Sequence, residues 1–154
     1  MSSRRQLLVF PLCGERYGLP LELVERVVRA VMLTPLPGAP AAIRGVFSLH
    51  GAIVPVGDLR RRLGLPERDI ALEDQIVVAR RARRLLGVLA EGDSEVLDCP
   101  QEDIVDAAEI VRSSGTVSGV ARLKSGLILI QDLARLLSLE EERALEEALH
   151  ARQA

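Results

Sequence analysis

The stretch that decides the fold spans residues 42–66 and reads AIRGVFSLHGAIVPVGDLRRRLGLP. Its apolar run at residues 43–49 predicts one β-strand, and the run at residues 52–56 predicts a second strand that returns beside it. His50 and Gly51 lie between the two runs and predict a tight turn, because glycine accepts a positive φ without a Cβ clash. The stretch therefore predicts a β-hairpin.

The residues after this hairpin predict a short helix. Asp58 is a suitable N-cap, since its carboxylate can accept hydrogen bonds from the free N–H groups of a helix at residues 59–63. Gly64 and Pro66 are typical of a helix end. Pro55 has no N–H to donate, so it indicates that the second strand lies at a sheet edge or contains a bulge.

The same pattern recurs later in the chain. When Asp58 is set on Asp132, residues 53–65 (IVPVGDLRRRLGL) fall on residues 127–139 (LILIQDLARLLSL). An internal repeat of this kind indicates two similar structural units. We therefore expect two β-rich halves, each of which ends in a short helix capped by an aspartate.

The length and composition fit a single domain made of these halves. The chain has 154 residues, and the repeat places the halves approximately at residues 17–66 and 76–139. Since 48% of the residues are hydrophobic and only 2% are aromatic, we expect an aliphatic core.

The remaining sequence predicts further strands, loops and one longer helix. Ser138 followed by Glu141 is a capping-box pattern that predicts the start of a C-terminal helix. Three prolines in residues 34–40 predict a loop, and residues 99–115 form a long mixed segment. The other predicted strands lie at residues 6–12, 17–21, 76–79, 85–89, 94–97, 117–123 and 127–130, with one more after a turn at residues 22–24.

Composition argues against several classes of function. A net charge of −2 with few aromatic residues argues against nucleic-acid binding, so we interpret the basic clusters at residues 60–62 and 80–84 as solvated surfaces. No apolar run approaches the roughly 20 residues of a membrane span. Cys13 and Cys99 make neither a disulfide framework nor a metal site. We expect a cytoplasmic protein with no cofactor and no metal.

Asp58 and Asp132 are the strongest candidates for a catalytic pair. Two carboxylates related by a repeat are typical of acid proteases, where like charges force one proton to be shared. Neither aspartate is followed by the Thr/Ser-Gly of such a site, and each precedes a leucine-rich helix. A nucleophile would also lack a base, because the only histidines are His50 at the predicted turn and His150 near the C-terminus. We interpret both aspartates as helix caps and predict that the chain is not an enzyme.

The valine-rich segment at residues 24–31 has two interpretations. Its valines can form part of the core, or they can form an apolar surface for a protein partner.

Several segments, in this order and spacing, make the sequence resemble the CheW-like domain family. This family is the adaptor module shared by bacterial chemotaxis coupling proteins and the regulatory end of the chemotaxis histidine kinase. The matching segments are residues 17–21 (YGLPL) with Val24 and Val27, 43–46 (IRGV), 51–59 (GAIVPVGDL), 87–97 (GVLAEGDSEVL) and 127–133 (LILIQDL).

The resemblance implies a mainly β fold of two intertwined, SH3-like, five-stranded β-barrels, with strands from the termini exchanged between the halves. It also implies a non-catalytic adaptor that bridges the cytoplasmic tip of a chemoreceptor to a CheA-type histidine kinase, in arrays at the inner face of the membrane. Carried over by position, the receptor contact comprises Val24, Arg26, Val27, Gly45 and His50. The kinase contact lies in the second half, near Val88 and Val96.

The sequence departs from the family pattern at His50. Family members usually have Asn-Leu-Arg-Gly there, whereas this chain has Ser48-Leu49-His50-Gly51. A histidine is mostly neutral near pH 7 and cannot form the bidentate pair that arginine forms with a carboxylate. We therefore hypothesise an adaptor of a divergent chemosensory array. The alternative is a stand-alone SH3-like module that binds peptides or ligands outside chemotaxis.

Overall fold

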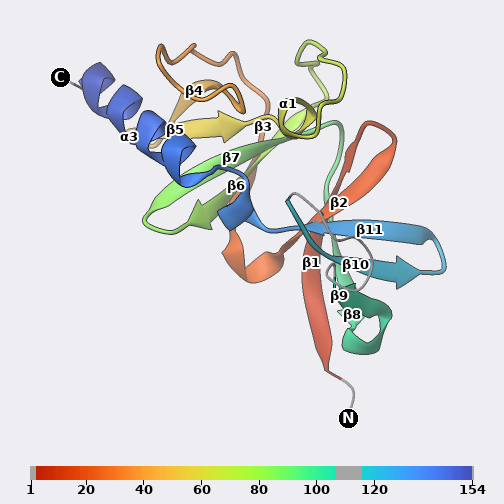
Figure 1. The fold of residues 1–154 in the computed structure, drawn as a ribbon. Coiled ribbons are helices and arrows are strands. Elements are labelled where there is room, and N and C mark those ends of the chain that lie inside the picture. The colour runs from red at the N-terminus through yellow and green to blue at the C-terminus, as the bar shows by residue number, and fades with distance from the viewer. Residues whose placement is uncertain (1–2, 107–115, 154) are drawn as a thin grey trace.

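The computed structural model describes residues 3–106 and 116–153, whose strands form two sheets (Figure 1). Residues 107–115 of the predicted mixed segment lie outside the described residues. The five-stranded sheet has the order β3 (Val24–Arg29), β6 (Gln75–Arg81), β7 (Arg84–Ala90), β5 (Ala52–Gly57) and β4 (Ile43–Leu49). The six-stranded sheet has the order β8 (Glu95–Pro100), β1 (Arg4–Leu12), β2 (Glu15–Pro20), β11 (Gly126–Gln131), β10 (Val117–Leu123) and β9 (Ile104–Asp106).

Helices are short except at the C-terminus, so the predicted mainly β fold with a C-terminal helix is confirmed. The sixth strand of the larger sheet, which was not expected, arises because β9 pairs with β10. The C-terminal helix begins with the predicted capping box: the Ser138 Oγ accepts from the Glu141 N–H (3.1 Å), and the Glu141 Oε1 accepts from the Ser138 N–H (2.9 Å). The helices are η1 (Leu21–Leu23), α1 (Leu59–Arg62), η2 (Gln101–Asp103), η3 (Leu133–Arg135) and α3 (Leu139–Gln153).

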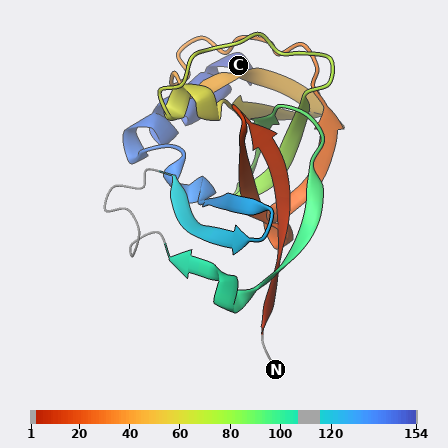
Figure 2. The same cartoon turned by 90° about the vertical axis from the view of Figure 1, so that its right-hand side faces the viewer.

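Each sheet combines strands from both halves of the chain. The β1–β2 hairpin lies between β8 and the β10–β11 hairpin, and Figure 2 shows the red N-terminal strands between the green and blue strands. In the other sheet, the β6–β7 hairpin lies between β3 and the β4–β5 hairpin. Parallel pairs join the hairpins: Val56 of β5 pairs with Gly87 of β7, and Ile130 of β11 pairs with Gly18 of β2.

The sequence repeat is also a repeat of backbone register. In the β4–β5 hairpin, Ile43 pairs with Gly57, and a bulge separates this pair from the next one. In the β10–β11 hairpin, the equivalent Val117 pairs with Gln131, and a bulge follows at the same place. The two halves therefore share the conformation of the hairpin as well as its sequence pattern.

Pro55 lies in a central strand, contrary to the prediction of an edge strand, because β5 is flanked by β4 and β7. It pairs with Val46, which uses its N–H and its C=O on Thr34 (2.8 and 2.9 Å) on the other side of β4. The pairing of β5 with β7 begins only at Val56. Neither β4 nor β7 therefore has a backbone carbonyl that needs a hydrogen bond from an N–H at position 55. The bulge that was the alternative prediction is not at Pro55 either, because the bulge of this hairpin lies between Ile43 and Gly45 of β4.

The core of the described residues consists of three mainly aliphatic clusters, which also contain Phe10, Tyr17 and Phe47. One cluster is built around Leu7 and Ile128 in the six-stranded sheet, and a second around Val54 and Val78 in the five-stranded sheet. The largest cluster contains residues of both sheets and the buried face of α3, including Leu145. The two sheets therefore share a core.

A network of ion pairs holds α1 against the rest of the fold. Arg60 pairs with Glu91, which also lies 3.0 Å from the Arg68 Nε and accepts from the Cys13 N–H at 2.7 Å. The Arg60 and Glu91 side chains are only 12% and 15% exposed, so the predicted solvated surface at residues 60–62 is wrong for Arg60. Burial alone raises the pKa of Glu91, but the hydrogen bonds from Arg60 and Cys13 and the charge of Arg68 together lower that pKa to about 2.

The second basic cluster, at residues 80–84, is solvated at Arg80 and Arg83 but not at Arg81 and Arg84. Arg81 donates from its Nε to the Leu133 carbonyl at 2.7 Å and pairs with Glu142 of α3. Arg84 lies 3.7 Å from the same glutamate. These arginines attach the C-terminal helix to the β6–β7 hairpin.

We predict that Glu91→Gln lowers the free energy of unfolding and weakens its dependence on pH in acid. Since the pKa is lowered from 4.5 to about 2 in the fold, the carboxylate stabilises the protein above about pH 4.5. This contribution, roughly 3 kcal/mol at most, is lost as the pH falls toward 2. Urea unfolding at several pH values measures it. The exposed Glu147→Gln is the control, and parallel pH curves for wild type and Glu91→Gln would contradict the prediction.

Candidate interaction surface

The predicted receptor contact centres on β3 and on the turn between β4 and β5. Arg26 reaches across from β3 to His50, with 2.8 Å between the Arg26 Nη1 and the His50 Nε2. Because a guanidinium can only donate, the His50 Nε2 is the acceptor in this contact. Since β3 and β4 are the two edge strands of the five-stranded sheet, this contact connects the edges. His50 and Gly51 have φ of 50° and 85°, as the predicted tight turn requires.

The two valines of the predicted contact lie apart from the charged pair. Val24 and Val27 are half-buried and pack against the cluster between the sheets, whereas Arg26 is exposed. Arg26 and Val27 are consecutive in the strand and point to opposite faces, and a bulge between Val24 and Arg26 shifts the alternation. β3 therefore has Val24 and Val27 on the face toward the cluster between the sheets, and Arg26 and the half-buried Val28 on the other face.

Gly45 lies in β4 but offers no surface to a partner. It is buried, and a Cβ atom there would lie 2.8 Å from the Thr34 carbonyl oxygen and 2.9 Å from the Leu33 Cβ. The glycine is needed so that the chain at Leu33 and Thr34 can cross β4. Gly45, which was predicted to belong to the receptor contact, therefore has a structural role instead.

The two residues predicted for the kinase contact differ sharply in exposure. Val88 is 1% exposed and belongs to the cluster between the sheets, so its side chain cannot touch a partner in this conformation. Val96 is 50% exposed and lies on β8, an edge strand of the six-stranded sheet. Of the two, only Val96 can take part in a contact.

The two repeated aspartates line different hollows and form no catalytic pair. Asp58 accepts from the Arg60 N–H and from the Arg44 Nη1, both at 2.9 Å, and its side chain is 3% exposed. Asp132 accepts from the Ala134 N–H at 3.0 Å, and its side chain is 38% exposed. Both carboxylates accept a hydrogen bond from the second N–H of the helix that follows, but only Asp58 also forms an ion pair with a partly buried cation, Arg44.

We predict that Asp58→Asn destabilises the protein much more than Asp132→Asn. Asparagine caps a helix about as well as aspartate, so the cap alone predicts little change at either site. Loss of the charge at Asp58 leaves Arg44 without its counterion, at a cost of roughly 2–3 kcal/mol. Urea unfolding of the two matched variants at pH 7 measures the difference, and equal loss in both variants would contradict the prediction.

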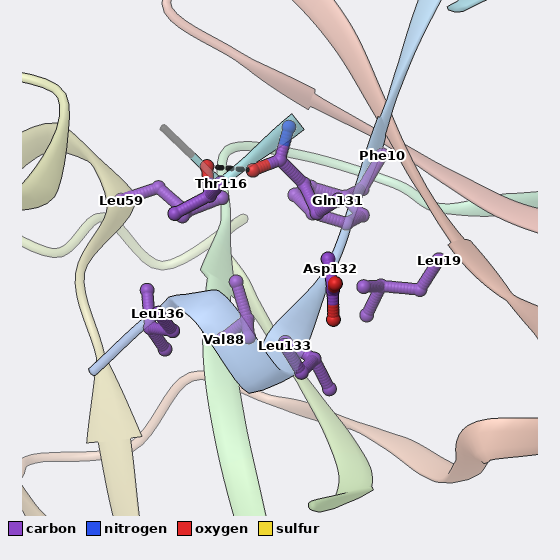
Figure 3. A pocket seen from close by; sticks show the side chains of 9 residues that line it. All are labelled: Phe10, Leu19, Leu59, Val88, Thr116, Gln131, Asp132, Leu133 and Leu136. Carbon is purple, nitrogen blue, oxygen red and sulfur yellow. Dashed lines mark hydrogen bonds between the residues drawn. The ribbon is translucent and has the colours of Figure 1, made fainter. Parts of the chain in front are cut away.

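An interior hollow lies where the two halves meet, and Figure 3 shows the side chains around it. The Thr116 hydroxyl donates to the Gln131 Oε1 at its polar side, while Leu59, Val88 and Leu136 contribute aliphatic groups. It has no room for a water molecule, so it is a packing junction rather than a ligand site.

The described part of the chain contains no group of three or more His, Cys, Asp or Glu side chains placed to hold a metal ion. No helix within residues 3–106 and 116–153 is long and apolar enough to cross a membrane.

No sequence pattern predicted the apolar surface around Met32 and Leu72, which are 94% and 91% exposed. The available signal is the pair of short apolar runs at residues 31–33 and 70–72, since both lie in connecting segments where polar residues are usual.

Comparisons with known proteins agree on one family. The CheW-like domain family model matches residues 6–141. The chain is 28% identical over 142 residues to the chemotaxis protein CheW of Treponema pallidum, covering 88% of this chain and 84% of that protein. It is 33% identical over 125 residues to the protein FrzA of Myxococcus xanthus, covering 74% and 78% of the two chains. The crystal structure of the scaffolding protein TtCheW from Thermoanaerobacter tengcongensis superposes with a TM-score of 0.81 at 27% identity, covering 92% of this chain and 96% of that chain.

Proposed function

The chain belongs to the CheW-like domain family of non-catalytic scaffold proteins, and we propose that it couples the cytoplasmic tip of a chemoreceptor to a CheA-type histidine kinase. The observation that carries this proposal is the family match over residues 6–141, which includes both sheets and the start of α3. Two carboxylates support it, because the buried Asp58 and the partly buried Glu91 are both paired with arginines and are not free to act on a substrate.

The receptor surface of this proposal lies along β3. Val24 and Val27 offer partly exposed apolar groups on one face of the strand, and Arg26 and His50 offer polar groups on the other face. Because β3 is an edge strand, a partner that lies along it can contact both faces. The kinase surface lies around Val96, on the edge strand of the other sheet. Partners on different sheets can bind at the same time, as an adaptor in a cytoplasmic receptor array requires.

The pair formed by Arg26 and His50 supports the proposal of a divergent array. Where an arginine at the turn would offer two parallel donors to a partner carboxylate, His50 uses its Nε2 to accept from Arg26. Arg26 is then the residue that carries the positive charge of this surface. A partner that fits this surface must place its acidic group beside the Arg26 guanidinium.

We predict that Val24→Asp and Arg26→Glu each abolish co-purification with the chemoreceptor fragment from the same cell and keep binding of the kinase regulatory domain. The first change puts a charge into the apolar part of the surface, and the second reverses its positive charge. Co-purification of each variant with each fragment, and a thermal melt to show that it folds, measure the effect.

The reciprocal control is Val96→Asp, which should lose the kinase domain and keep the receptor fragment. Loss of both partners in a folded variant would contradict the separation of the two surfaces. Failure of the folded wild-type chain to bind either fragment would contradict the adaptor proposal and favour a stand-alone binding module.

We predict that His50→Arg strengthens binding to a receptor or kinase fragment from a family member that has the usual Asn-Leu-Arg-Gly turn. The new guanidinium restores the bidentate donor, but it also lies beside Arg26. The double variant Arg26→Glu/His50→Arg replaces this repulsion by an ion pair and serves as the matched comparison. Titration calorimetry measures both affinities. Unchanged affinity in both variants would remove His50 from the explanation of partner choice.

A further inference from the structure

A segment outside any helix or strand lies between α1 and β6. It comprises residues 66–74, is called the strap below, and is the yellow-green loop beside α1 in Figure 1. Within the described part of the chain, residues 66–73 make no backbone hydrogen bond to any residue outside the strap. The position of the strap therefore depends on side chains, one pair of which is the exposed ion pair of Arg61 with Glu67 (2.5 Å).

Arginine side chains hold the strap against the rest of the fold. Arg60 donates from its Nη1 to the Pro66 carbonyl at 2.7 Å, and Arg44 donates to the Arg68 carbonyl at 3.2 Å. Arg68 is itself part of the strap, and its Nε lies 3.0 Å from the Glu91 Oε2. The attachment is therefore largely ionic and lies at the surface end of the network that holds α1.

Ile70 is the apolar side chain of the strap that packs against the core. It is half-buried and contacts the cluster around Val54 and Val78, as does Val28 of β3. Leu72, by contrast, projects into solvent. A segment with few buried apolar contacts and few backbone hydrogen bonds can open at a low cost in free energy while the rest of a protein stays folded.

Asp74 connects the strap to β3. Its side chain is only 4% exposed, and its carboxylate accepts from the Arg68 Nη2 at 2.7 Å and from the Ala71 N–H at 2.8 Å. Its backbone carbonyl accepts from the Ala30 N–H at 2.9 Å, directly after the last pair of the β3–β6 ladder. Because β3 is an edge strand whose neighbour in the sheet is β6, the end of β3 depends on the conformation of Asp74.

We propose that the strap opens as one unit while both sheets stay folded, and that its opening releases the end of β3. In the closed state, Arg68 fixes the Asp74 carboxylate, and the Asp74 carbonyl holds the Ala30 N–H. In the open state this bond is lost, and Ile70 leaves the cluster that also supports β3. Since β3 carries the proposed receptor surface, the consequence for binding rests on the proposed function: the strap controls how firmly that surface is held.

Amide hydrogen exchange of the free chain, followed residue by residue by NMR, tests the opening. The reporters are the N–H groups of Ala30, Ala71 and Asp74, which are all hydrogen-bonded in the closed strap. We expect the three to share one opening free energy, lower than that of the paired amides in β5 and β7. Arg68→Gln should speed exchange at all three by at least about tenfold and leave the β5 and β7 amides unchanged.

Two further measurements separate the ionic attachment from a general loss of stability. Arg83→Gln is the matched control, because Arg83 is exposed at the turn between β6 and β7 and should leave the three rates unchanged. The wild-type chain in about 1 M NaCl should show faster exchange at the same three reporters, since salt screens partly exposed ion pairs. This salt measurement does not depend on how well a variant folds.

The exchange rates can overturn the proposal in three ways. Reporters that are as strongly protected as the β5 and β7 amides would show that the strap opens only by global unfolding. Rates that neither Arg68→Gln nor salt changes would exclude an ionic attachment. An Ala30 rate that stays constant while the Ala71 and Asp74 rates rise would exclude the link to β3.

The receptor fragment separates this inference from the proposed function. Binding and closure favour each other equally, so the bound fragment should slow exchange at the three reporters, and Arg68→Gln should weaken the fragment but not the kinase regulatory domain. Equal affinity of wild type and Arg68→Gln for the fragment overturns control of the receptor surface by the strap. A wild-type chain that binds no fragment contradicts the proposed function alone, because the exchange measurements use the free chain.

Discussion

The structure depends on two places where hairpins from different halves of the chain approach each other in parallel. At Gly87, a Cβ atom would lie 2.7 Å from the Ile76 Cγ2 and 3.2 Å from the Val56 Cγ2, and at Gly18 it would lie 3.0 Å from the Ile128 Cγ2. Any larger residue would force β-branched neighbours to move, and these have little rotamer freedom. Because each contact joins strands far apart in sequence, neither half can complete its sheet alone.

This exchange of strands explains why the protein acts through its surface. The two sheets share one core, and the hollow at their junction has no room for water. The carboxylates of the buried Asp58 and the partly buried Glu91 are neutralised by arginines and hold α1 in place. What remains for recognition is the exposed side of edge strands and turns, which suits a scaffold that binds proteins rather than one that transforms a substrate.

The local features of the fold could be predicted from the sequence, and the long-range ones could not. The turn at His50, the position of Asp58 and the repeat each depend on residues close in sequence or on self-similarity. Pro55 was misplaced because its tolerance in a central strand depends on Val46 bonding to Thr34, which lies in a loop. Arg60 and Arg81 were interpreted as solvated because charge runs usually are, and their partners Glu91 and Glu142 are remote in sequence. Val88 was assigned to the kinase contact by its position in the family pattern, and such a position does not tell whether the side chain faces a partner or the core.

The repeat also shows where the two halves have diverged. Their hairpins keep the same register and bulge, so the backbone is constrained in both. The hairpin tips are not constrained in this way: His50 contacts Arg26 on the edge strand β3, whereas Ser125 accepts from Arg16 on the neighbouring β2 at 2.9 Å. In the first half, the hairpin tip therefore contacts a charged side chain on an exposed edge strand. In the second half, the hairpin tip is hydrogen-bonded to an interior strand. Because packing fixes the hairpins and leaves their tips free to change, differences between the halves in partner choice should reside in the tips and edge strands.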